Sequence, residues 1–362
     1  MERLPVPQPV PTGDPCPPRP LLVGYYGEHN LGDDALLEVL LSQLPDGCDP
    51  LVTARDQEQV RGWHGVRCVD RTSFPEVLAG LRASSALVFG GGSLLQDSTS
   101  FRSLLYYAVL IQMARLQGKP VLLWAQGLGP LRRRRSRLLV RLLLGQIAAC
   151  SWRDAASEAL ARELGCRTAD SVIGSDPVWS LPSRAWHGKG GPVVLCFRPT
   201  GLLEGERWRP WLEALEQLAP ERELLWLPLH THQDRGLLAL LKREGLLSDQ
   251  LATRSRELAP ERPSDVTDIC AGAGLVLAMR LHGLILAALS GAPVAALSYD
   301  PKVQAAALAL GCPVHDLGSS VEPGCLAAEW SHSLDQATPG ARLQGLQQGV
   351  EPHHRLLAAH LI

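Results

Sequence analysis

Short apolar runs that end in glycine-containing turns recur along this chain, and they constrain its fold more than any other feature. Residues 21–26 form the first run, and a turn with Gly27 and Gly32 separates it from a helix-like segment at residues 33–41. A buried strand, a glycine turn and a helix in succession are typical of parallel sheets, because parallel strands are joined by crossover helices. We therefore expect an α/β fold.

The same pattern occurs in two successive halves. Further buried strands are expected at residues 86–89, 121–125, 193–197, 224–227, 275–279 and 293–297. The 362 residues suffice for two domains, and the pattern stops and restarts around a Pro- and Gly-rich segment at 180–192. The sequence predicts two Rossmann-like doubly wound domains that face each other across a cleft. We expect a disordered Pro-rich tail at 1–20, the domains at 21–185 and 192–335, and a C-terminal helix near the domain junction at 336–362.

Charge and cysteine content argue against several classes of protein. The formal net charge is −2, so the composition does not indicate a nucleic-acid partner. The nine cysteines form no C-x-x-C pair, which predicts reduced thiols in a cytoplasmic protein and no metal site. Residues 1–20 lack the apolar core of a signal peptide. The uncharged run at 281–299 is interrupted by Gly291 and Pro293, which favours a helix followed by a strand over a membrane span.

Ligands of open α/β sheets bind beyond the carboxyl ends of the strands, so the turns after the strands are the candidate sites. The first turn carries Asn30, Asp33 and Asp34. Asn30 can donate and accept hydrogen bonds, and either aspartate can accept a proton from a sugar hydroxyl. The alternative is that both acids only cap the next helix and complement its dipole. The glycine spacing does not match the nicotinamide-binding pattern G-x-G-x-x-G.

The second candidate turn follows the expected strand at 86–89. Its glycines, including Gly91 and Gly92, expose backbone N–H groups that suit an anionic or hydroxylated ligand. Gln96 and Asp97 are placed to bind hydroxyls. The alternative is that the glycines only meet the steric requirement of a tight turn.

Two turns in the second half carry cations. Arg280 and His282 are two residues apart, so in an extended turn their side chains project to the same side. A guanidinium binds phosphate or carboxylate, and a neighbouring histidine can hold or donate a proton near neutral pH. Lys302 follows the next strand and reaches the same pocket if the two strands are neighbours. The alternatives are a buried histidine beside an arginine paired with an acid, and an exposed lysine at a helix start.

Three weaker signals remain. Arg153 can reach the cleft or pair structurally with Asp154, and His230 ends a strand that can line the cleft. The segment from Arg132 to Arg141 contains six arginines among apolar residues. A basic helix with an apolar face can lie on an anionic membrane, or its leucines can pack in the core while its arginines are solvated. The sequence favours the second interpretation.

Five motifs occur in order: G-Y-Y-G-x-x-N-L-G-D-D-A at 24–35, G-G-G-S-L-L-Q-D at 90–97, A-Q-G-L-G-P at 125–130, M-R-L-H-G at 279–283 and S-Y-D-P-K-V at 298–303. Together they resemble the polysaccharide pyruvyltransferase family, and its CsaB type in particular. The resemblance covers about residues 21–325 and includes Gln126, in the third motif. W-R-D at 152–154 is similar to a V-R-D segment usual in the family, with Trp in place of a smaller residue.

The resemblance implies a fold similar to the two-domain GT-B glycosyltransferases. It also implies transfer of pyruvate from phosphoenolpyruvate to two hydroxyls of one sugar, which gives a cyclic ketal and releases phosphate. For the CsaB type, the acceptor is N-acetylmannosamine in a lipid-linked cell-wall polymer precursor, and the polymer later anchors surface-layer proteins. The family's essential basic residues align with Arg153, His282 and Lys302.

The residues also suit this chemistry by themselves. Phosphoenolpyruvate must be protonated at its methylene carbon, and His282 is the candidate donor. Arg280, Lys302 and Arg153 can bind the phosphate and carboxylate, and Asp33, Asp34 or Asp97 can act as base toward the sugar. We expect no cofactor other than phosphoenolpyruvate as co-substrate, and no metal.

Two rival functions remain open at this point. One is a GT-B glycosyltransferase with a nucleotide-sugar donor, although no acidic residue in the second domain clearly suits the donor ribose. The other is a non-catalytic sugar-binding module, which would not need such a concentration of cations. We expect a cytoplasmic protein with peripheral contact to the inner face of the membrane if the basic segment binds lipid.

Overall fold

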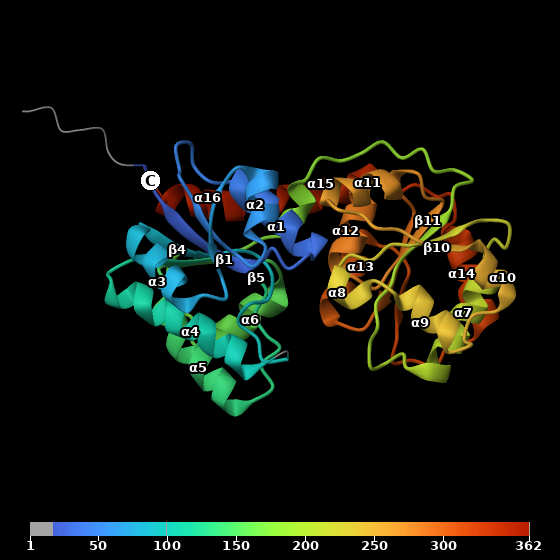
Figure 1. Cartoon of the computed structure of the whole chain (residues 1–362), viewed down its shortest axis with the longest axis horizontal. Helices are drawn as coiled ribbons and strands as arrows, with labels where there is room; N and C mark the ends of the chain where they lie inside the picture. Colours follow the sequence, from blue (N-terminus) through green and yellow to red (C-terminus); the bar gives the residue numbers. More distant parts are fainter. Residues whose placement is uncertain (1–16, 99, 362) are drawn as a thin grey trace, which may run out of the picture.

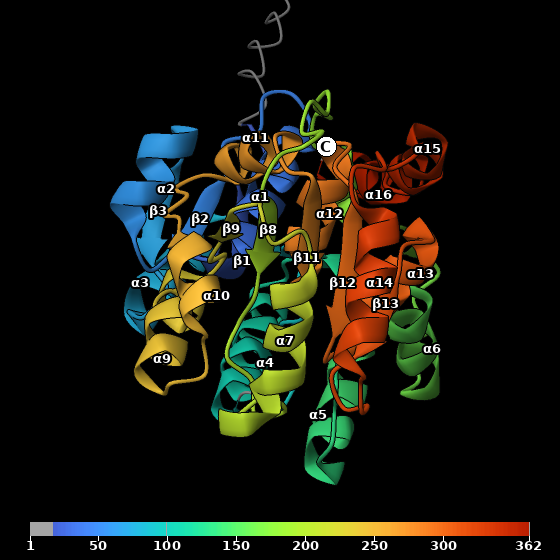
Figure 2. The same ribbon diagram turned by 90° about the vertical axis from the view of Figure 1, so that its right-hand side faces the viewer.

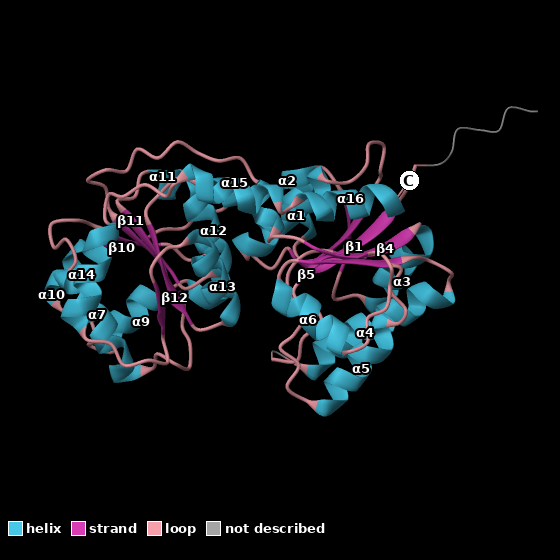
Figure 3. Ribbon diagram, turned by 180° about the vertical axis from the view of Figure 1, so that it is seen from behind, coloured by secondary structure: helices cyan, strands magenta, loops and turns pink. Residues whose placement is uncertain are grey.

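The computed structural model describes residues 17–98 and 100–361 of the chain. Two α/β domains lie side by side, the first coloured blue to green and the second mostly yellow to red in Figure 1. Each domain has one sheet with helices on both faces, as Figure 3 shows. The predicted fold class is confirmed. The predicted tail falls outside the described residues up to residue 16, and at its other end Pro20 already belongs to the first strand.

The first sheet has seven strands in the order β3-β2-β1-β4-β5-β6-β7, all parallel. The strands are β1 (Pro20–Tyr26), β2 (Leu51–Ala54), β3 (Arg67–Asp70), β4 (Ala86–Phe89), β5 (Val121–Gln126), β6 (Ala149–Trp152) and β7 (Ser171–Ile173). The helices are α1 (Leu31–Ser42), α2 (Gln57–His64), α3 (Phe74–Ala83), α4 (Phe101–Leu116), α5 (Arg134–Leu144) and α6 (Ala155–Glu163), followed by the 3₁₀ turn η1 (Pro177–Ser180).

The second sheet has six strands in the order β10-β9-β8-β11-β12-β13, also all parallel. The strands are β8 (Val193–Cys196), β9 (Leu224–Trp226), β10 (Ser255–Glu257), β11 (Leu275–Ala278), β12 (Val294–Ser298) and β13 (Val314–Asp316). The helices are η2 (Gly205–Trp208), α7 (Arg209–Gln217), α8 (Thr231–Asp234), α9 (Leu237–Arg243), α10 (Asp249–Arg254), α11 (Pro263–Ala271), α12 (Leu281–Leu289), α13 (Pro301–Leu310), α14 (Pro323–Ser333), α15 (Gly340–Gln348) and α16 (Glu351–His360).

The two sheets have the same order in their central strands. In each, the chain moves outward in one direction and then returns to the other side of the first strand, between β1 and β4 and between β8 and β11. Such a reversal leaves a crevice beyond the carboxyl ends of the two strands, where ligands of doubly wound sheets bind. The turns that follow these four strands therefore lie at the ligand-binding position of each domain.

Helices cover both faces of each sheet, and this explains why the central strands are apolar throughout. All four residues of β4 and all four of β11 are buried, as expected for parallel strands covered on both sides. In the first domain, α3, α4 and α5 pack on one face, and α1, α2 and α16 on the other. Full burial of a leucine side chain stabilises a fold by about 1.5–3 kcal/mol.

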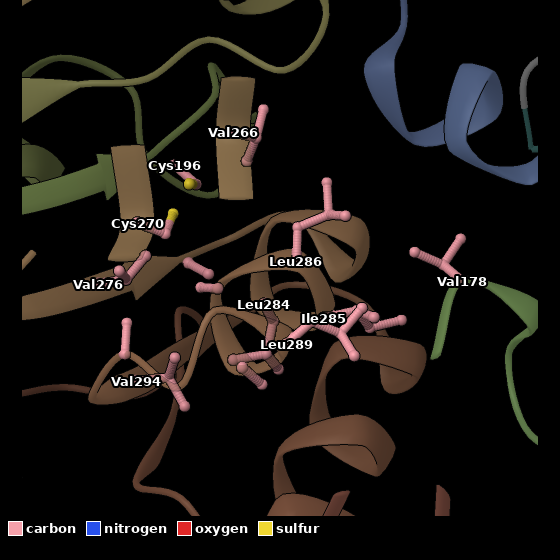
Figure 4. Packing of buried hydrophobic residues seen from close by; sticks show 14 of the residues in the cluster. Val178, Cys196, Val266, Cys270, Val276, Leu284, Ile285, Leu286, Leu289 and Val294 are labelled. Atoms are coloured by element: carbon pink, nitrogen blue, oxygen red, sulfur yellow. The ribbon is translucent and has the colours of Figure 1, made fainter. Parts of the chain in front are cut away.

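The domains share apolar packing beside the cleft. Leu36 of α1 and Val178 of η1 belong to the same buried cluster as Leu284 and Ile285 of α12, and Figure 4 shows part of this cluster around α12. The main chains also meet, because the amide of Leu31 donates to the carbonyl of Leu229 over 2.9 Å. The apolar cluster and this backbone contact hold α1 against the second domain.

The C-terminal segment crosses back to the first domain. Residues 336–362 were expected to form one helix near the junction, but they contain two, α15 and α16. Leu356 and Leu357 of α16 pack with Trp124 of β5, and Nε2 of His353 lies 2.7 Å from the Ser175 carbonyl oxygen. The run at 281–299 forms α12 and β12 as predicted. Within the described residues, none of the helices combines the length and apolar character needed to span a bilayer.

Candidate functional site

A polar cavity of about 160 Å³ lies between the domains, at the carboxyl ends of the central strands. The first domain lines it with Asn30, Gly32, Asp33, Gly92, Ser93 and Arg153, and the second with Leu229, Arg280, Leu281, His282, Tyr299, Asp300, Lys302 and Val303. The structure thus brings Arg280, His282 and Lys302 to one hollow opposite the Asn30–Asp33 turn, as the turn positions predicted. Sequence separation alone would not reveal this, because the two sides come from different domains.

Asn30 and Asp33 form the start of α1. Asn30 has an extended backbone, and its side-chain oxygen accepts from the Gly32 amide over 3.2 Å, which caps the helix. Its side-chain amide donates to Asp33 Oδ2. Burial raises the pKa of Asp33, against the opposing charges of His282, Arg280 and Arg153. Asp33 is therefore a more basic carboxylate than an exposed one would be.

His282 lies in the first turn of α12 and packs directly against α1. A Cβ atom on Gly32 would lie 2.1 Å from Nδ1 of His282, so only glycine at position 32 allows this approach. Nε2 of His282 lies 3.6 Å from Oδ2 of Asp176. This nitrogen is buried and has no hydrogen-bond partner among the described residues. The imidazole is thus held between the two domains.

Asp176 is the main residue that sequence reasoning missed. Its Oδ2 accepts from Nη1 of Arg153 over 3.3 Å, and its Oδ1 accepts from the amide of Val178 over 3.1 Å. Burial acts to raise the pKa of Asp176, but the neighbouring charges of His282 and Arg153 outweigh it, and the pKa falls to about 2. Asp176 is therefore a buried anion that pairs with the guanidinium of Arg153 and lies beside the imidazole of His282. It follows β7, a three-residue strand that the apolar pattern did not reveal.

Ser93 connects Arg153 with Lys302. Its hydroxyl accepts from Nη2 of Arg153 over 3.0 Å and from Nζ of Lys302 over 3.4 Å. Nζ of Lys302 also lies 3.5 Å from Oδ2 of Asp300, which caps α13. Burial lowers the pKa of Lys302, and the charge of Arg153 lowers it further. Two cations from different domains therefore converge on one hydroxyl.

Arg280 lines the cavity but is also paired with an acid. Its Nε donates to Oδ2 of Asp234 over 3.0 Å, and a second bond joins Nη2 to Oδ1. Asp234 is buried, and it also accepts from the amide of His230 over 2.9 Å. The structure thus combines the two interpretations of Arg280, because a buried carboxylate orients the guanidinium at the edge of the cavity.

Arg198 is a second residue that sequence reasoning missed. It follows β8 at the chain reversal, and its Nη1 donates to the Tyr299 hydroxyl over 3.0 Å. Its Nη2 donates to Oε1 of Gln233 over 3.2 Å, and Gln233 also accepts from Arg280 over 3.2 Å. The signal was available, because Arg198 directly follows the apolar strand expected at residues 193–197.

Asp97 was predicted at the site and lies elsewhere. Its two carboxylate oxygens accept from the amides of Arg132 and Arg133, each over 2.9 Å. Burial acts to raise the pKa of Asp97, but these two amide hydrogen bonds outweigh it and the pKa is lowered. Asp97 does not line the cavity. Its carboxylate orders the turn before α5, so the structure does not support Asp97 as the base.

Three further candidates in this region also lie away from the cavity. Gln126 is buried, and its amide donates to the carbonyl of Gly90. Gln96 accepts from the amide of Ser98 over 2.6 Å. Gly91 packs on α1, where a Cβ would lie 2.8 Å from a methyl of Leu36. For Gly91, the structure supports the steric alternative, whereas Gly92, with φ of 101°, does line the cavity.

Asp34 and His230 are buried beside the site rather than in its lining. Burial, together with the charge of Asp33, raises the pKa of Asp34 to about 8. Burial and the charge of Arg280 lower the pKa of His230 to about 4. The backbone of His230 pairs with that of Asn30 across the domain junction. These positions favour a role for both residues in packing at the junction. No group of three or more His, Cys, Asp or Glu within residues 17–98 and 100–361 is arranged to hold a metal ion.

Solved structures share this two-domain architecture at very low sequence identity. HepE from Anabaena in complex with UDP-glucose has a TM-score of 0.60 and 12% identity, and the match covers 94% of this chain and 98% of that chain. UDP-GlcNAc 2-epimerase from Methanocaldococcus jannaschii has a TM-score of 0.63 and 11% identity, with coverage of 94% and 99%. The lipopolysaccharide galactosyltransferase WaaB has a TM-score of 0.54 and 9% identity, with coverage of 94% and 98%. These similarities show the GT-B-like fold.

No curated protein sequence matches this chain significantly. The family model for polysaccharide pyruvyl transferases, in contrast, matches residues 30–301. That range begins at the Asn30 cap, includes Arg153, Asp176 and His282, and ends at the first residue of α13. It spans both sides of the cavity and most of the chain, and the protein therefore belongs to the polysaccharide pyruvyl transferase family.

Proposed function

We propose that this protein transfers pyruvate from phosphoenolpyruvate to two hydroxyls of one sugar in a polysaccharide precursor, forming a cyclic ketal and releasing phosphate. The observation that carries the proposal is the convergence of Arg153, Lys302, Arg280 and His282 on one cavity between the domains. Phosphoenolpyruvate has a phosphate and a carboxylate on a three-carbon unit. A small cavity lined by several cations suits such an anion better than it suits a neutral sugar alone.

The reaction requires a proton at the methylene carbon of phosphoenolpyruvate, and we assign its delivery to His282. The imidazole lines the cavity, and its Nε2 lies 3.6 Å from Oδ2 of the buried carboxylate of Asp176, which orients the ring. Protonation turns the methylene into a methyl group and leaves cationic character on the adjacent carbon. The first sugar hydroxyl attacks that carbon, and its proton passes to a base.

Asp33 is the best-placed base among the three aspartates that the sequence suggested. It lines the cavity, and burial raises its pKa. A carboxylate with a raised pKa is a stronger base toward a sugar hydroxyl. Asn30 donates to Oδ2 of Asp33 and so fixes its orientation. Asp34 and Asp97 lack this position.

Phosphate departure follows, and Arg153 and Lys302 are the cations that we assign to it. Both donate to the Ser93 hydroxyl, so they lie close together at one end of the cavity. Fixed cations stabilise the charge that develops on a leaving phosphate. The second sugar hydroxyl then attacks the same carbon, and the phosphate carries away the remaining proton. No metal or further cofactor is required in this scheme.

We assign the acceptor by resemblance to the CsaB type. It is N-acetylmannosamine in a lipid-linked cell-wall precursor, whose polymer anchors surface-layer proteins. Such an acceptor lies at the inner face of the membrane, so we propose a cytoplasmic enzyme that works at that surface. The five motifs support this finer assignment.

Phosphate release from phosphoenolpyruvate with a panel of sugar acceptors tests the proposal. We expect release only when acceptor and enzyme are both present, and a pyruvyl ketal on the acceptor by mass spectrometry. Calorimetric titration with phosphoenolpyruvate and with UDP-glucose separates this function from a nucleotide-sugar glycosyltransferase. Tight binding of UDP-glucose, without phosphate release from phosphoenolpyruvate on any acceptor, would overturn the proposal.

A further inference from the structure

The chain between Asp97 and Asp154 contains ten Lys and Arg residues and not one Asp or Glu. This acid-free stretch includes α4 and α5, which lie side by side. The guanidinium of Arg135 lies over the ring of Phe101 at 4.1 Å, and Gln112 donates to Gln146 over 2.7 Å. In Figures 1 and 2, α5 lies at the lower extremity of the molecule. The helix pair thus presents a basic surface at one end of the first domain.

Helix α5 has an inner and an outer face. Val140, Leu143 and Leu144 are buried in the core of the first domain. Leu138 and Leu142, in contrast, are 60% and 59% exposed. The interpretation that the leucines of this helix only pack in the core therefore accounts for one face and not for the other.

The outer face of α5 carries both arginines and leucines. Arg134, Leu138 and Arg141 are exposed and follow helical spacing, as do Arg135, Leu138 and Leu142. None of Arg134, Arg135 and Arg141 forms an ion pair with a carboxylate of the described residues. The charges of these three exposed side chains are therefore not compensated by a carboxylate within the described residues.

Helix α4 extends the same kind of surface. Leu105, Val109 and Leu116 are 40%, 38% and 77% exposed, and their spacing places them along one side of the helix. Arg102 and Arg115 are exposed on the same helix. Half of the ten large hydrophobic residues that are exposed in the described part of the chain lie on α4 and α5.

The carboxylates around this surface already have other hydrogen-bond or ion-pair partners. Glu163 of α6 pairs with Arg137 over 2.5 Å, and Glu158 pairs with Arg162 over 2.7 Å. Asp97 is buried under the start of α5 and accepts from backbone amides. The nearby acids therefore leave the charge of the outer arginines uncompensated.

We propose that the outward surface of α4 and α5 docks on an anionic phospholipid bilayer. Exposed leucines flanked by arginines can insert at the headgroup boundary while the guanidiniums bind anionic headgroups. Contact with a second copy of this chain is less suitable, because a symmetric contact would bring arginines of one copy against arginines of the other.

The docking surface is connected to the cavity through one turn. The turn after β4 carries Ser93 on the cavity, and four residues later it carries Asp97, which binds the first amides before α5. The start of α5 is therefore held by the same turn that lines the cavity, which relates docking of α5 to an acceptor held at the same membrane. This relation rests on the lipid-linked acceptor of the proposed function, whereas the docking itself does not require any transfer reaction.

Vesicle co-sedimentation of the full chain tests the proposal. The probes are phosphatidylcholine vesicles and vesicles with equal parts of phosphatidylcholine and phosphatidylglycerol. We expect binding to the anionic vesicles only, and a steady loss of binding as salt is raised. Equal binding to both kinds of vesicle, or binding to neither, would overturn the proposal.

Two variants locate the surface. Leu138→Gln with Leu142→Gln should lower vesicle affinity at least about tenfold through lost apolar insertion. Arg134→Ser with Arg141→Ser should lower it about thirtyfold, because each arginine near an anionic surface contributes about a fivefold gain. Circular dichroism checks that both variants keep the fold.

Two single-residue control variants make the same kinds of substitution elsewhere on the molecule. Leu308→Gln removes a leucine that is 65% exposed on α13, and Arg207→Ser removes an exposed arginine of η2. Both should bind anionic vesicles like the wild-type protein. The assignment would be refuted if a control lost as much affinity as the α5 variants. It would also be refuted if the α5 variants changed the particle mass in sedimentation velocity but left vesicle binding intact.

The same variants separate docking from catalysis. Phosphate release on a short water-soluble acceptor should stay at the wild-type level in the Leu138 and Leu142 double variant. If vesicle binding fails while this release is normal, only the docking proposal falls. If wild-type vesicle binding is normal while no acceptor supports phosphate release, only the proposed function falls.

Discussion

The turn after β4 and the turn after β11 occupy equivalent places in their sheets, yet they contribute differently to the cavity. From the turn after β11, Arg280, Leu281 and His282 all line the cavity, because α12 begins at once and its first residues project from its amino end. From the turn after β4, only Gly92 and Ser93 do so. A longer loop follows before α4, and it carries the other polar side chains away.

The difference teaches that equivalent topology does not give equivalent chemistry. The side chains of Asp97 and Gln126 form hydrogen bonds with backbone groups of neighbouring turns. Arg280 and His282 are instead oriented by the buried acids Asp234 and Asp176 and keep one side toward the cavity. We therefore regard the first turn mainly as support and the second as the source of the reacting groups.

The largest expected effect is on His282. His282→Asn should lower the rate of phosphate release by about 10²–10⁴-fold, the usual contribution of a general acid, and leave the fold intact. Gln96→Ala, the matched change in the turn after β4, should keep the rate within about twofold. Steady-state kinetics with circular dichroism checks both. Comparable losses of rate in the two variants would show that the two turns do not differ in their contribution to catalysis.

Asp176→Asn should have the next largest effect. It removes the anion beside the imidazole and the guanidinium of Arg153, so kcat should fall about tenfold to a hundredfold, which corresponds to about 1.4–2.7 kcal/mol. The KM for phosphoenolpyruvate should change less than kcat, because Arg280 and Lys302 still line the cavity. Asp176→Glu should restore part of the rate. An unaltered kcat in the Asn variant would show that Asp176 is merely structural.

The same residue makes a prediction about acid stability. The pKa of Asp176 falls from its ordinary 3.8 to about 2 in the folded protein. Its contribution to stability is therefore present above pH 3.8 and lost as the pH falls toward 2, and it amounts to about 2 kcal/mol. Urea unfolding along this acid range should show a steeper loss for the wild-type protein than for Asp176→Asn. Parallel curves would contradict the ion-pair assignment.

Asp97→Asn should affect stability rather than chemistry. The amide group can accept from only one of the two backbone N–H groups and turns a donor toward the other, which should cost about 1–3 kcal/mol. Denaturant unfolding measures the loss, and the rate per folded molecule should stay near that of the wild type. A large fall in kcat in a variant that is fully folded would show that Asp97 takes part in the reaction.

Ser93→Ala should have the smallest effect. It removes the hydroxyl that joins Arg153 and Lys302, a net loss of about 1 kcal/mol and thus about a fivefold rise in KM for phosphoenolpyruvate. The kcat should change less than KM, because both cations remain. An unchanged KM would mean that Ser93 does not contribute to the binding of phosphoenolpyruvate.

The apolar pattern revealed most of the central strands, but it missed strands that are short or partly exposed. Strand β7 has three residues that are half-buried or exposed, so no apolar run marks it, and Asp176 beyond it went unnoticed. Arg198 follows an expected strand but belongs to none of the five motifs. The exposed half of α5 was hidden for another reason, because leucines look alike in a sequence whether they face the core or solvent.

The sequence alone determined the two parallel α/β units and the turns where chemistry can occur, because strand and helix periods and glycine turns are local properties of the chain. Only the tertiary structure decided which polar side chains face the cavity. Asp33 and Asp97 both follow glycines near strand ends, yet one lines the cavity and the other binds two amides. That choice depends on which buried partner satisfies each group, and the partners come from segments far away in the chain.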